Sequence, residues 1–193
     1  MLWIKNNLNK KFKWSIIGQQ VLMAQVYLPT IFANMNKKIL PDYLHKYLKI
    51  GGAKVPFNTD AWDGYPRERE RLFKELKKAN SVLVLTGDTH NSWLNNLYDA
   101  NNNFIGVEIG TPAISSPNTI DTFGSLTDRI EEEFIKENKN VMWTEGKHKG
   151  YTLLKLTKDK SEVCFVYVNT VKSRVYEVID NHKFNVKLNT PII

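Results

Sequence analysis

Cysteine is nearly absent from this sequence, and long apolar runs are missing altogether. Cys164 is the only cysteine, so the chain forms no intrachain disulfide and no thiolate zinc cluster. Residues 1–12 carry lysines but no apolar stretch of signal-peptide length, and no later segment approaches the length of a membrane span. We therefore expect no membrane span and no export signal in this chain, and the compartment stays unknown.

Several common enzyme motifs are missing as well. The sequence has no glycine-rich phosphate-binding loop and no G-x-S-x-G element. Cys164 lies inside a strand-like run, where nothing in the sequence would activate its thiol. The candidate functional groups are therefore sought among the aspartates and histidines.

The charge is positive but scattered. The 27 Lys and Arg exceed the 20 Asp and Glu and give a net charge of +7, which suits phosphate-bearing ligands or nucleic acid. The excess comes from dispersed lysines, with no long basic run of the kind that marks a nucleic-acid-binding arm. We favour a solvated lysine surface and expect no specific nucleic-acid partner.

The order of the predicted elements indicates an α/β fold. The 193 residues, 42% of them apolar, suffice for one domain with a core. The patterns predict strands at residues 14–26 (ending near Gly18), 82–85, 104–109, 151–156, 162–168, 175–179 and 184–188, helices from Pro66 onward and at 126–136, and a connector with a short helix at 34–48. Helix and strand alternate first, and an antiparallel extension of the sheet follows.

The most informative segment is VLVLTGDTH, residues 82–90, in which a buried strand is followed by TGDTH. Ligands gather at the carboxyl ends of strands in open α/β sheets, and Gly87 would let the chain turn so that Asp88 and His90 enter a common cleft. Carboxylate and imidazole are ligands of hydrolytic di-metal centres. The same spacing also suits Asp88 as the cap of a following helix, with Thr89 and His90 in its first turn.

The second candidate is NTDAWDGYPRER, residues 58–69. Asp60 and Asp63 could ligate a metal, position a water or hold an arginine, while Trp62 and Tyr65 could form an apolar wall for a substrate. The alternative is a turn whose aspartates make local contacts and whose aromatic rings pack over the core. This alternative is favoured for Asp63 and Tyr65, whereas Asp60 stays open because it has no evident helix to cap.

The other histidines give weaker signals. His45 lies in a lysine-flanked segment and His148 between two lysines at a turn, so both are interpreted as surface residues. For His148, a role at the rim of a phosphate site is the alternative. His182 has no partner that the sequence identifies.

Taken in order, five blocks resemble the C-terminal part of PhoD-like alkaline phosphatases and phosphodiesterases, within the metallophosphoesterase superfamily. The resemblance runs from Trp14 to Arg174. Its blocks are WSIIGQQVLMAQ, NTDAWDGYPRERERLF, VLVLTGDTHNSW, VEIGTPAISSP, and HKGYTLLKLT with VNTV. Each block has modest specificity, but five in the same order with compatible spacing make chance similarity improbable.

The resemblance implies a fold, a cofactor and a site. The family's fold is an αββα sandwich, and its members use iron and calcium or similar divalent ions to hydrolyse phosphomonoesters and phosphodiesters. Matching motif to motif puts Asp88 and His90 on metal-ligand positions. The same matching lets Asp60 and Trp62 line the site as substrate-binding residues. The metal ions would polarise the phosphoryl oxygens and activate water.

The sequence departs from the family pattern in one respect. The family's D-x-x-D, G-D-x-x-x-Y and Asn-bearing motifs come from earlier strands, and none is present. One Asp and one His cannot complete a di-metal site. We therefore expect residues 1–193 to form the C-terminal part of one PhoD-like domain and to be inactive as an isolated chain. The missing half would come from a separate chain, or this chain is a non-catalytic, partner-binding remnant.

Overall fold

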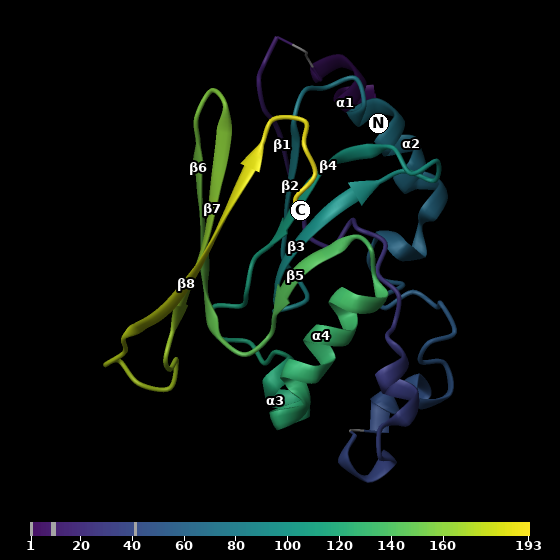
Figure 1. Ribbon diagram of the computed structural model, residues 1–193, viewed down its shortest axis with the longest axis vertical. Helices are drawn as coiled ribbons and strands as arrows, with labels where there is room; N and C mark the ends of the chain where they lie inside the picture. Colours follow the sequence, from purple (N-terminus) through teal and green to yellow (C-terminus); the bar gives the residue numbers. More distant parts are fainter. Residues whose placement is uncertain (1, 9–10, 41) are drawn as a thin grey trace.

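In the computed structural model, which describes residues 2–8, 11–40 and 42–193, the strands form two sheets (Figure 1). The five-stranded sheet has the order β1-β2-β4-β3-β5, and the three-stranded sheet has the order β6-β7-β8. The strands are β1 (Ser15–Gly18), β2 (Val82–Thr86), β3 (Ser92–Tyr98), β4 (Phe104–Gly110), β5 (Val141–Glu145), β6 (Lys149–Leu156), β7 (Lys160–Val168) and β8 (Val178–Lys187).

The direction of the strands defines two edges of the larger sheet. Strands β1, β2 and β4 are parallel, and β3 is antiparallel to both β4 and β5. Strand β5 therefore runs in the same direction as β2 and β4. The carboxyl ends of β1, β2, β4 and β5 meet at one edge, which we call the carboxyl edge.

Short helices cover the outer face of the five-stranded sheet. They are α1 (Leu2–Asn7), α2 (Pro66–Leu76), α3 (Thr119–Phe123) and α4 (Thr127–Glu137), with 3-10 turns η1 (Thr30–Asn34), η2 (Lys37–Ile39), η3 (Asp42–Lys49), η4 (Trp62–Gly64) and η5 (Gly124–Leu126). Helix α2 begins at Pro66, whose fixed φ suits the first helical turn. Its apolar stripe of Leu72, Phe73 and Leu76 is buried against the sheet.

The opposite face of the five-stranded sheet packs against the three-stranded sheet. Leu83, Leu94 and Val107 contact Val163 and Phe165 across this interface. The predicted α/β class is confirmed, and the layers are helix, sheet and sheet (Figure 1). Strand β2 is covered on both faces, which explains its uninterrupted apolar run.

The C-terminal strands differ from the prediction in two ways. They form a separate sheet that packs face to face on the first, rather than extending it. The two edge strands predicted at 175–179 and 184–188 are one strand, β8, in which Asn181 and His182 pair with Val166 and Phe165. Strand β8 lies at the edge of its sheet, where turn-favouring residues are tolerated better than in a central strand.

The sequence patterns did not predict β3. The reason is its pair of asparagines, Asn95 and Asn96, which are rare in buried strands. Both side chains have partners: the Asn95 Nδ2 donates to Glu108 at 2.8 Å, and the Asn96 Nδ2 donates to the Ile192 carbonyl at 2.9 Å. Hydrogen bonding lets these polar side chains be buried in the strand.

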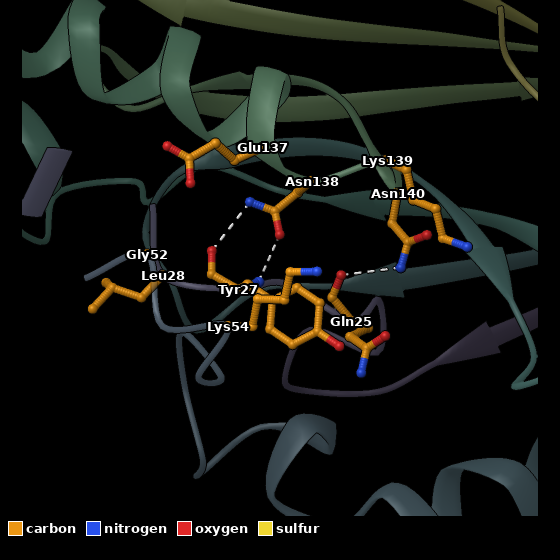
Figure 2. Close-up of a pocket in the computed structure, with 9 residues that line it drawn as sticks. All are labelled: Gln25, Tyr27, Leu28, Gly52, Lys54, Glu137, Asn138, Lys139 and Asn140. Carbon is orange, nitrogen blue, oxygen red and sulfur yellow. Dashed lines mark hydrogen bonds between the residues drawn. The ribbon is translucent and has the colours of Figure 1, made fainter. Parts of the chain in front are cut away.

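The segment 25–28, between β1 and η1, is held by two asparagines near the amino end of β5 (Figure 2). Asn138, at the end of α4, accepts from the Tyr27 N at 2.6 Å and donates to the Tyr27 carbonyl at 3.1 Å. Asn140, just before β5, donates to the Gln25 carbonyl at 3.0 Å. A cavity of about 510 Å³ lies here. Its asparagine side chains hold the backbone, so we assign this region a structural role.

The helices found among residues 2–8, 11–40 and 42–193 are all too short or too polar to cross a lipid bilayer.

Glu108 is the buried charged group at the centre of the sheet. It lies in β4 with 0% exposure and accepts from the Met23 N at 2.5 Å, the Ala24 N at 3.0 Å and the Asn95 Nδ2 at 2.8 Å. Burial raises the pKa of its carboxyl to about 7, although the three donors act in the opposite direction. The carboxyl therefore fixes the backbone of residues 22–24 against the sheet.

The raised pKa of Glu108 predicts that this group lowers stability as the pH rises. A folded-state pKa above the unfolded value gives stability that is fully present below pH ~4.5 and is lost as the pH rises through about 7. At about 1.4 kcal/mol per pH unit, the loss reaches about 3 kcal/mol. In urea unfolding between pH 5 and pH 8, the free energy of unfolding of the wild type should fall relative to that of Glu108→Gln as the pH rises, because only the wild type has the titrating carboxyl. A difference that does not change with pH would refute the assignment.

Candidate functional site

The turn after β2 lies at the carboxyl edge and has an uncommon backbone. Asp88 and His90 both adopt the left-handed region, with φ of 69° and 64°. Such conformations in residues other than glycine are costly and cluster at functional sites. The expectation that Gly87 makes the turn is wrong, because its φ is not positive and an added Cβ would lie 3.7 Å from the Thr111 Cγ2. Asp88 and His90 make the turn themselves.

The chain continues from this turn into a strand. Strand β3 begins at Ser92, so the alternative in which Asp88 caps a following helix is wrong. The turn is fixed on both sides: the Gly87 N donates to the Gln20 carbonyl at 2.8 Å, and the Trp93 Nε1 donates to the Thr89 Oγ1 at 2.9 Å. The Asp88 side chain is exposed within this fixed frame.

His90 is oriented in the way that metal-binding histidines are. Its Nδ1 lies 2.7 Å from the Pro117 carbonyl oxygen. A carbonyl only accepts, so in the neutral ring Nδ1 carries the proton and Nε2 keeps its lone pair. Within residues 2–8, 11–40 and 42–193, neither His90 Nε2 nor the Asp88 carboxylate has a hydrogen-bond partner. A histidine whose second nitrogen donates to a carbonyl is typical of metal sites.

The loop 58–63 reaches the same edge through Trp62. The Trp62 Nε1 donates to the Gln19 Oε1 at 3.2 Å, and the Gln19 N continues the β1–β2 pairing by donating to the Leu85 carbonyl at 3.0 Å. Trp62 is half-buried against the core, whereas the Asp60 side chain is exposed. The Asn58 Oδ1 accepts from the Asp60 N at 2.9 Å. Asp60 and Trp62 thus lie on a loop that borders the carboxyl edge.

Asp63 holds an arginine, which was one of its possible roles, whereas the favoured interpretation of a turn with only local contacts is wrong. Its side chain and that of Arg69 are each 6% exposed, with 2.5 Å between Oδ1 and Nη1. The Val26 N donates to the Asp63 Oδ2 at 2.8 Å. Burial raises the pKa of Asp63, and the Val26 and Arg69 hydrogen bonds oppose that shift. Tyr65 is 58% exposed, so the interpretation that it packs over the core is wrong.

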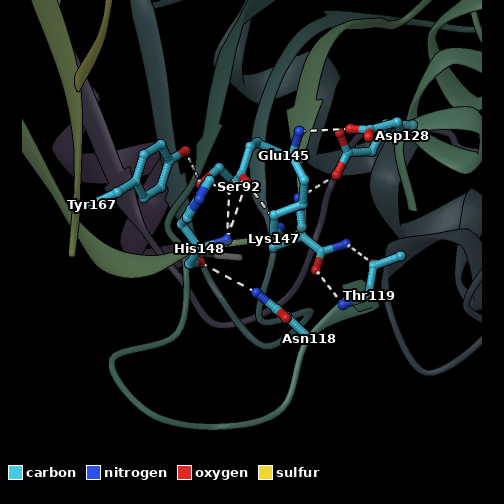
Figure 3. Close-up of polar contacts among 11 residues, drawn as sticks. Ser92, Asn118, Thr119, Asp128, Glu145, Lys147, His148 and Tyr167 are labelled. Carbon is cyan, nitrogen blue, oxygen red and sulfur yellow. Dashed lines mark hydrogen bonds and ion pairs between the residues drawn. The ribbon is translucent and has the colours of Figure 1, made fainter. Parts of the chain in front are cut away.

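His148 is held in a polar network rather than free on the surface (Figure 3). Its Nδ1 lies 2.9 Å from the Glu145 Oε1, and its ring centroid lies 5.5 Å from that of Tyr167. The Tyr167 hydroxyl contacts the Ser92 Oγ at 2.7 Å, and burial raises the Tyr167 pKa. The network sits at the end of β5, on the carboxyl edge. The sequence carried no signal for it, because Glu145 and Tyr167 lie far apart along the chain.

The two remaining histidines have structural partners. The His45 Nε2 lies 3.0 Å from the Leu40 carbonyl oxygen, so its ring contacts the backbone although it was expected on the surface. The His182 ring lies 5.1 Å from that of Trp143. Neither histidine lies on the turn with Asp88.

A cavity of about 360 Å³ opens beside Asp88 at the carboxyl edge. Asn58, Thr89 and Asn118 contribute polar groups to it, and aromatic side chains from η1, η3, α3 and α4 form much of its wall. Sequence reasoning missed this cavity, because its residues come from segments spread between Leu28 and Phe134. We call it the carboxyl-edge cavity.

Among the described residues, no further candidate metal-binding side chain joins Asp88 and His90 in a cluster. Across the described part of the chain, no three His, Cys, Asp or Glu side chains gather closely enough to hold a metal ion. The turn after β2 thus offers one exposed carboxylate, from Asp88, and one imidazole nitrogen, from His90.

The fold and the sequence both match known proteins. A solved structure of PhoD superposes with a TM-score of 0.73 at 24% identity, covering 96% of this chain and 32% of that one. The sequence model of the PhoD-like phosphatase family matches residues 1–165. This chain belongs to that family, which confirms the resemblance.

A relative of known name is also similar, and it shows how much of a longer protein this chain covers. Alkaline phosphatase D of Bacillus subtilis (strain 168) is 30% identical over 163 residues, which cover 80% of this chain and 23% of the relative. The chain therefore spans about a quarter of this relative and about a third of the matched structure.

The buried Asp63–Arg69 pair predicts a large cost for removing the arginine. Arg69→Met leaves a buried carboxylate without its counter-charge, and the free energy of unfolding should fall by about 3–5 kcal/mol in urea denaturation. Arg71→Met is the matched control on the same helix, because its pair with Glu68 is exposed and should contribute about 0–1 kcal/mol. Equal losses in the two variants would contradict this prediction.

Proposed function

We propose that this chain supplies one side of a metal-dependent phosphoesterase site, with Asp88 and His90 as metal ligands. The observation that carries the proposal is the turn after β2. Its two left-handed residues present an exposed carboxylate and an imidazole whose Nδ1 is anchored to the Pro117 carbonyl. Membership of the PhoD-like phosphatase family supports a phosphoesterase function.

The donor set fits a hydrolytic metal site in part. A carboxylate oxygen and a neutral imidazole nitrogen suit zinc, iron and similar divalent ions, and the carboxylate also suits calcium. Iron and calcium are the ions that the resemblance implied. When bound, such ions polarise phosphoryl oxygens and lower the pKa of water. Asp88 and His90 would hold them, and the Pro117 carbonyl keeps His90 in the tautomer that can ligate.

The rest of the site would come from residues outside this chain. The chain covers 23% of one relative and 32% of the matched structure, and two protein ligands do not complete a di-metal centre. We propose that residues 1–193 form the C-terminal part of a single PhoD-like domain, which is inactive until the remaining part joins it from the same or a separate chain. The substrates would be phosphomonoesters or phosphodiesters.

A second candidate is a non-catalytic, partner-binding module of the same fold. The observation that favours it is that no third acidic, histidine or cysteine side chain approaches Asp88 and His90 in the described ranges. The two candidates differ in metal-dependent hydrolysis once the remaining part of the domain is supplied. If the chain is a non-catalytic module, hydrolysis should not be restored when the remaining part of the domain is supplied.

The metal assignment predicts the loss of activity on substituting either ligand. In a chimera where this chain replaces the matched segment of Bacillus subtilis alkaline phosphatase D, metal-dependent hydrolysis of p-nitrophenyl phosphate should appear. Asp88→Asn or His90→Ala should each reduce it by roughly 100-fold or more, because losing even a second-layer partner of a metal ligand costs about 10- to 100-fold.

The control for this experiment is Asp159→Asn, which removes a carboxylate at the exposed turn between β6 and β7. It should leave hydrolysis unchanged. Full activity in both Asp88→Asn and His90→Ala would show that the ligands are assigned wrongly.

Substitutions in the loop 58–63 should affect substrate binding and stability to different extents. We propose that Asp60 and Trp62 border the substrate. Asp60 is exposed, so it should affect substrate binding and not stability. In the same chimera, Asp60→Asn should change KM and leave the thermal midpoint within about 1 °C of wild type. Trp62→Phe should change KM as well, and should lower the midpoint because it removes the hydrogen bond to Gln19. Unchanged KM in both variants would exclude the loop from the site.

A further inference from the structure

The carboxyl-edge cavity has the composition of a small-molecule site. Its volume of about 360 Å³ lies within the range of roughly 300–1,000 Å³ that such sites occupy. Phe57 and Phe123 supply apolar wall, while Asp88, Asn58 and Thr89 supply polar groups on the side of the TGDTH turn. A mostly apolar pocket with a few convergent polar groups is the usual form of a ligand site.

The apolar wall is held in place by contacts between aromatic rings. The Phe32 ring lies 5.7 Å from Phe123 at an interplanar angle of 82°, and the Phe134 ring lies 5.0 Å from Phe57 at 78°. These edge-to-face arrangements are the favoured geometry for aromatic pairs. The wall is therefore formed before any ligand enters.

The same aromatic cluster is connected to the proposed metal ligands. The Trp93 ring lies 5.4 Å from Phe134, and the Trp93 Nε1 donates to the Thr89 Oγ1 at 2.9 Å. Thr89 lies between Asp88 and His90. Trp93 thus contacts both the apolar wall and the turn that carries Asp88.

A fixed polar side chain lies in the cavity lining beside the aromatic wall. Asn118 is 5% exposed, and its Nδ2 donates to the His148 carbonyl at 3.2 Å. Asn118 and Asp121 form a capping box at the start of α3, in which the Asn118 side chain accepts from the Asp121 backbone. The polar part of the lining is therefore held by the fold, as the aromatic wall is.

We infer that this cavity binds the alcohol portion of the phosphate ester, and that this alcohol is aromatic. The inference rests on the proposed function, because Asp88 would place the phosphoryl group at the mouth of the cavity. The ring of the alcohol packs against the Phe57 and Phe123 walls. Glycerol-like alcohols offer donors but no apolar surface, so they gain little from this wall.

The test measures binding of the free alcohol and needs neither metal nor hydrolysis. 2-Naphthol is titrated into the ¹⁵N-labelled full chain, with glycerol as the polar comparison. Resonances of the cavity residues should shift with 2-naphthol and not with glycerol. Phe123→Ala should weaken 2-naphthol binding by roughly fivefold or more, because it removes ring contact from a half-buried wall position.

Two further variants keep the result interpretable. Tyr176→Ala removes an aromatic ring that is 60% exposed ahead of β8, outside the cavity lining, and should leave binding unchanged. Thr122→Trp places bulk at a half-buried lining position of α3 and should abolish binding while the chain retains its near-ultraviolet circular dichroism.

The outcomes separate this inference from the proposed function. Absent 2-naphthol binding, or binding that Phe123→Ala and Thr122→Trp leave unchanged, overturns the aromatic-alcohol site even if the chimera hydrolyses p-nitrophenyl phosphate. Binding that persists in Asp88→Asn, while hydrolysis is lost, supports both. Specific 2-naphthol binding in a chain whose chimera shows no metal-dependent hydrolysis leaves the cavity as an aryl-binding site and refutes the catalytic proposal.

Discussion

Buried carboxylates hold the crossing segment of residues 22–26 against the five-stranded sheet, and the carboxyl edge depends on them. Glu108 accepts the Met23 and Ala24 amides from inside β4, and Asp63 accepts the Val26 amide while paired with Arg69. A segment without regular structure needs such partners, because its buried amides have no ladder to join. The cost is a desolvated carboxyl at the centre of the fold, whose pKa rises to about 7.

This constraint places the loop with Trp62 beside the turn with Asp88. The Trp62 N donates to the Leu22 carbonyl at 3.2 Å, while its Nε1 reaches Gln19. Two of the five sequence blocks that resembled the PhoD-like family, those with Trp62 and Asp88, are thus connected through the segment that Glu108 fixes. They were separate motifs in the sequence, and in the fold they border one edge.

The α/β class, helix α2, helix α4 and the β6–β7 hairpin were all predictable, because each follows from a local pattern. Strand β3 was not, since Asn95 and Asn96 look unsuited to a buried strand until Glu108 and Ile192 are brought beside them. The turn residues were also misjudged. Glycine was expected to bend the chain after β2, whereas Asp88 and His90 carry the left-handed conformations.

The sequence by itself determined that a buried strand ends in an aspartate and a histidine, and that the blocks around it belong to the PhoD-like phosphatases. Hydrophobic periodicity and short motifs are local features, so they can be recognised from the sequence without a structure. Only the tertiary structure decided that His90 is anchored at Pro117, that His148 contacts Glu145, and that rings from five separate segments line a cavity beside Asp88. These contacts join residues far apart in the chain, and packing, rather than local propensity, selects them.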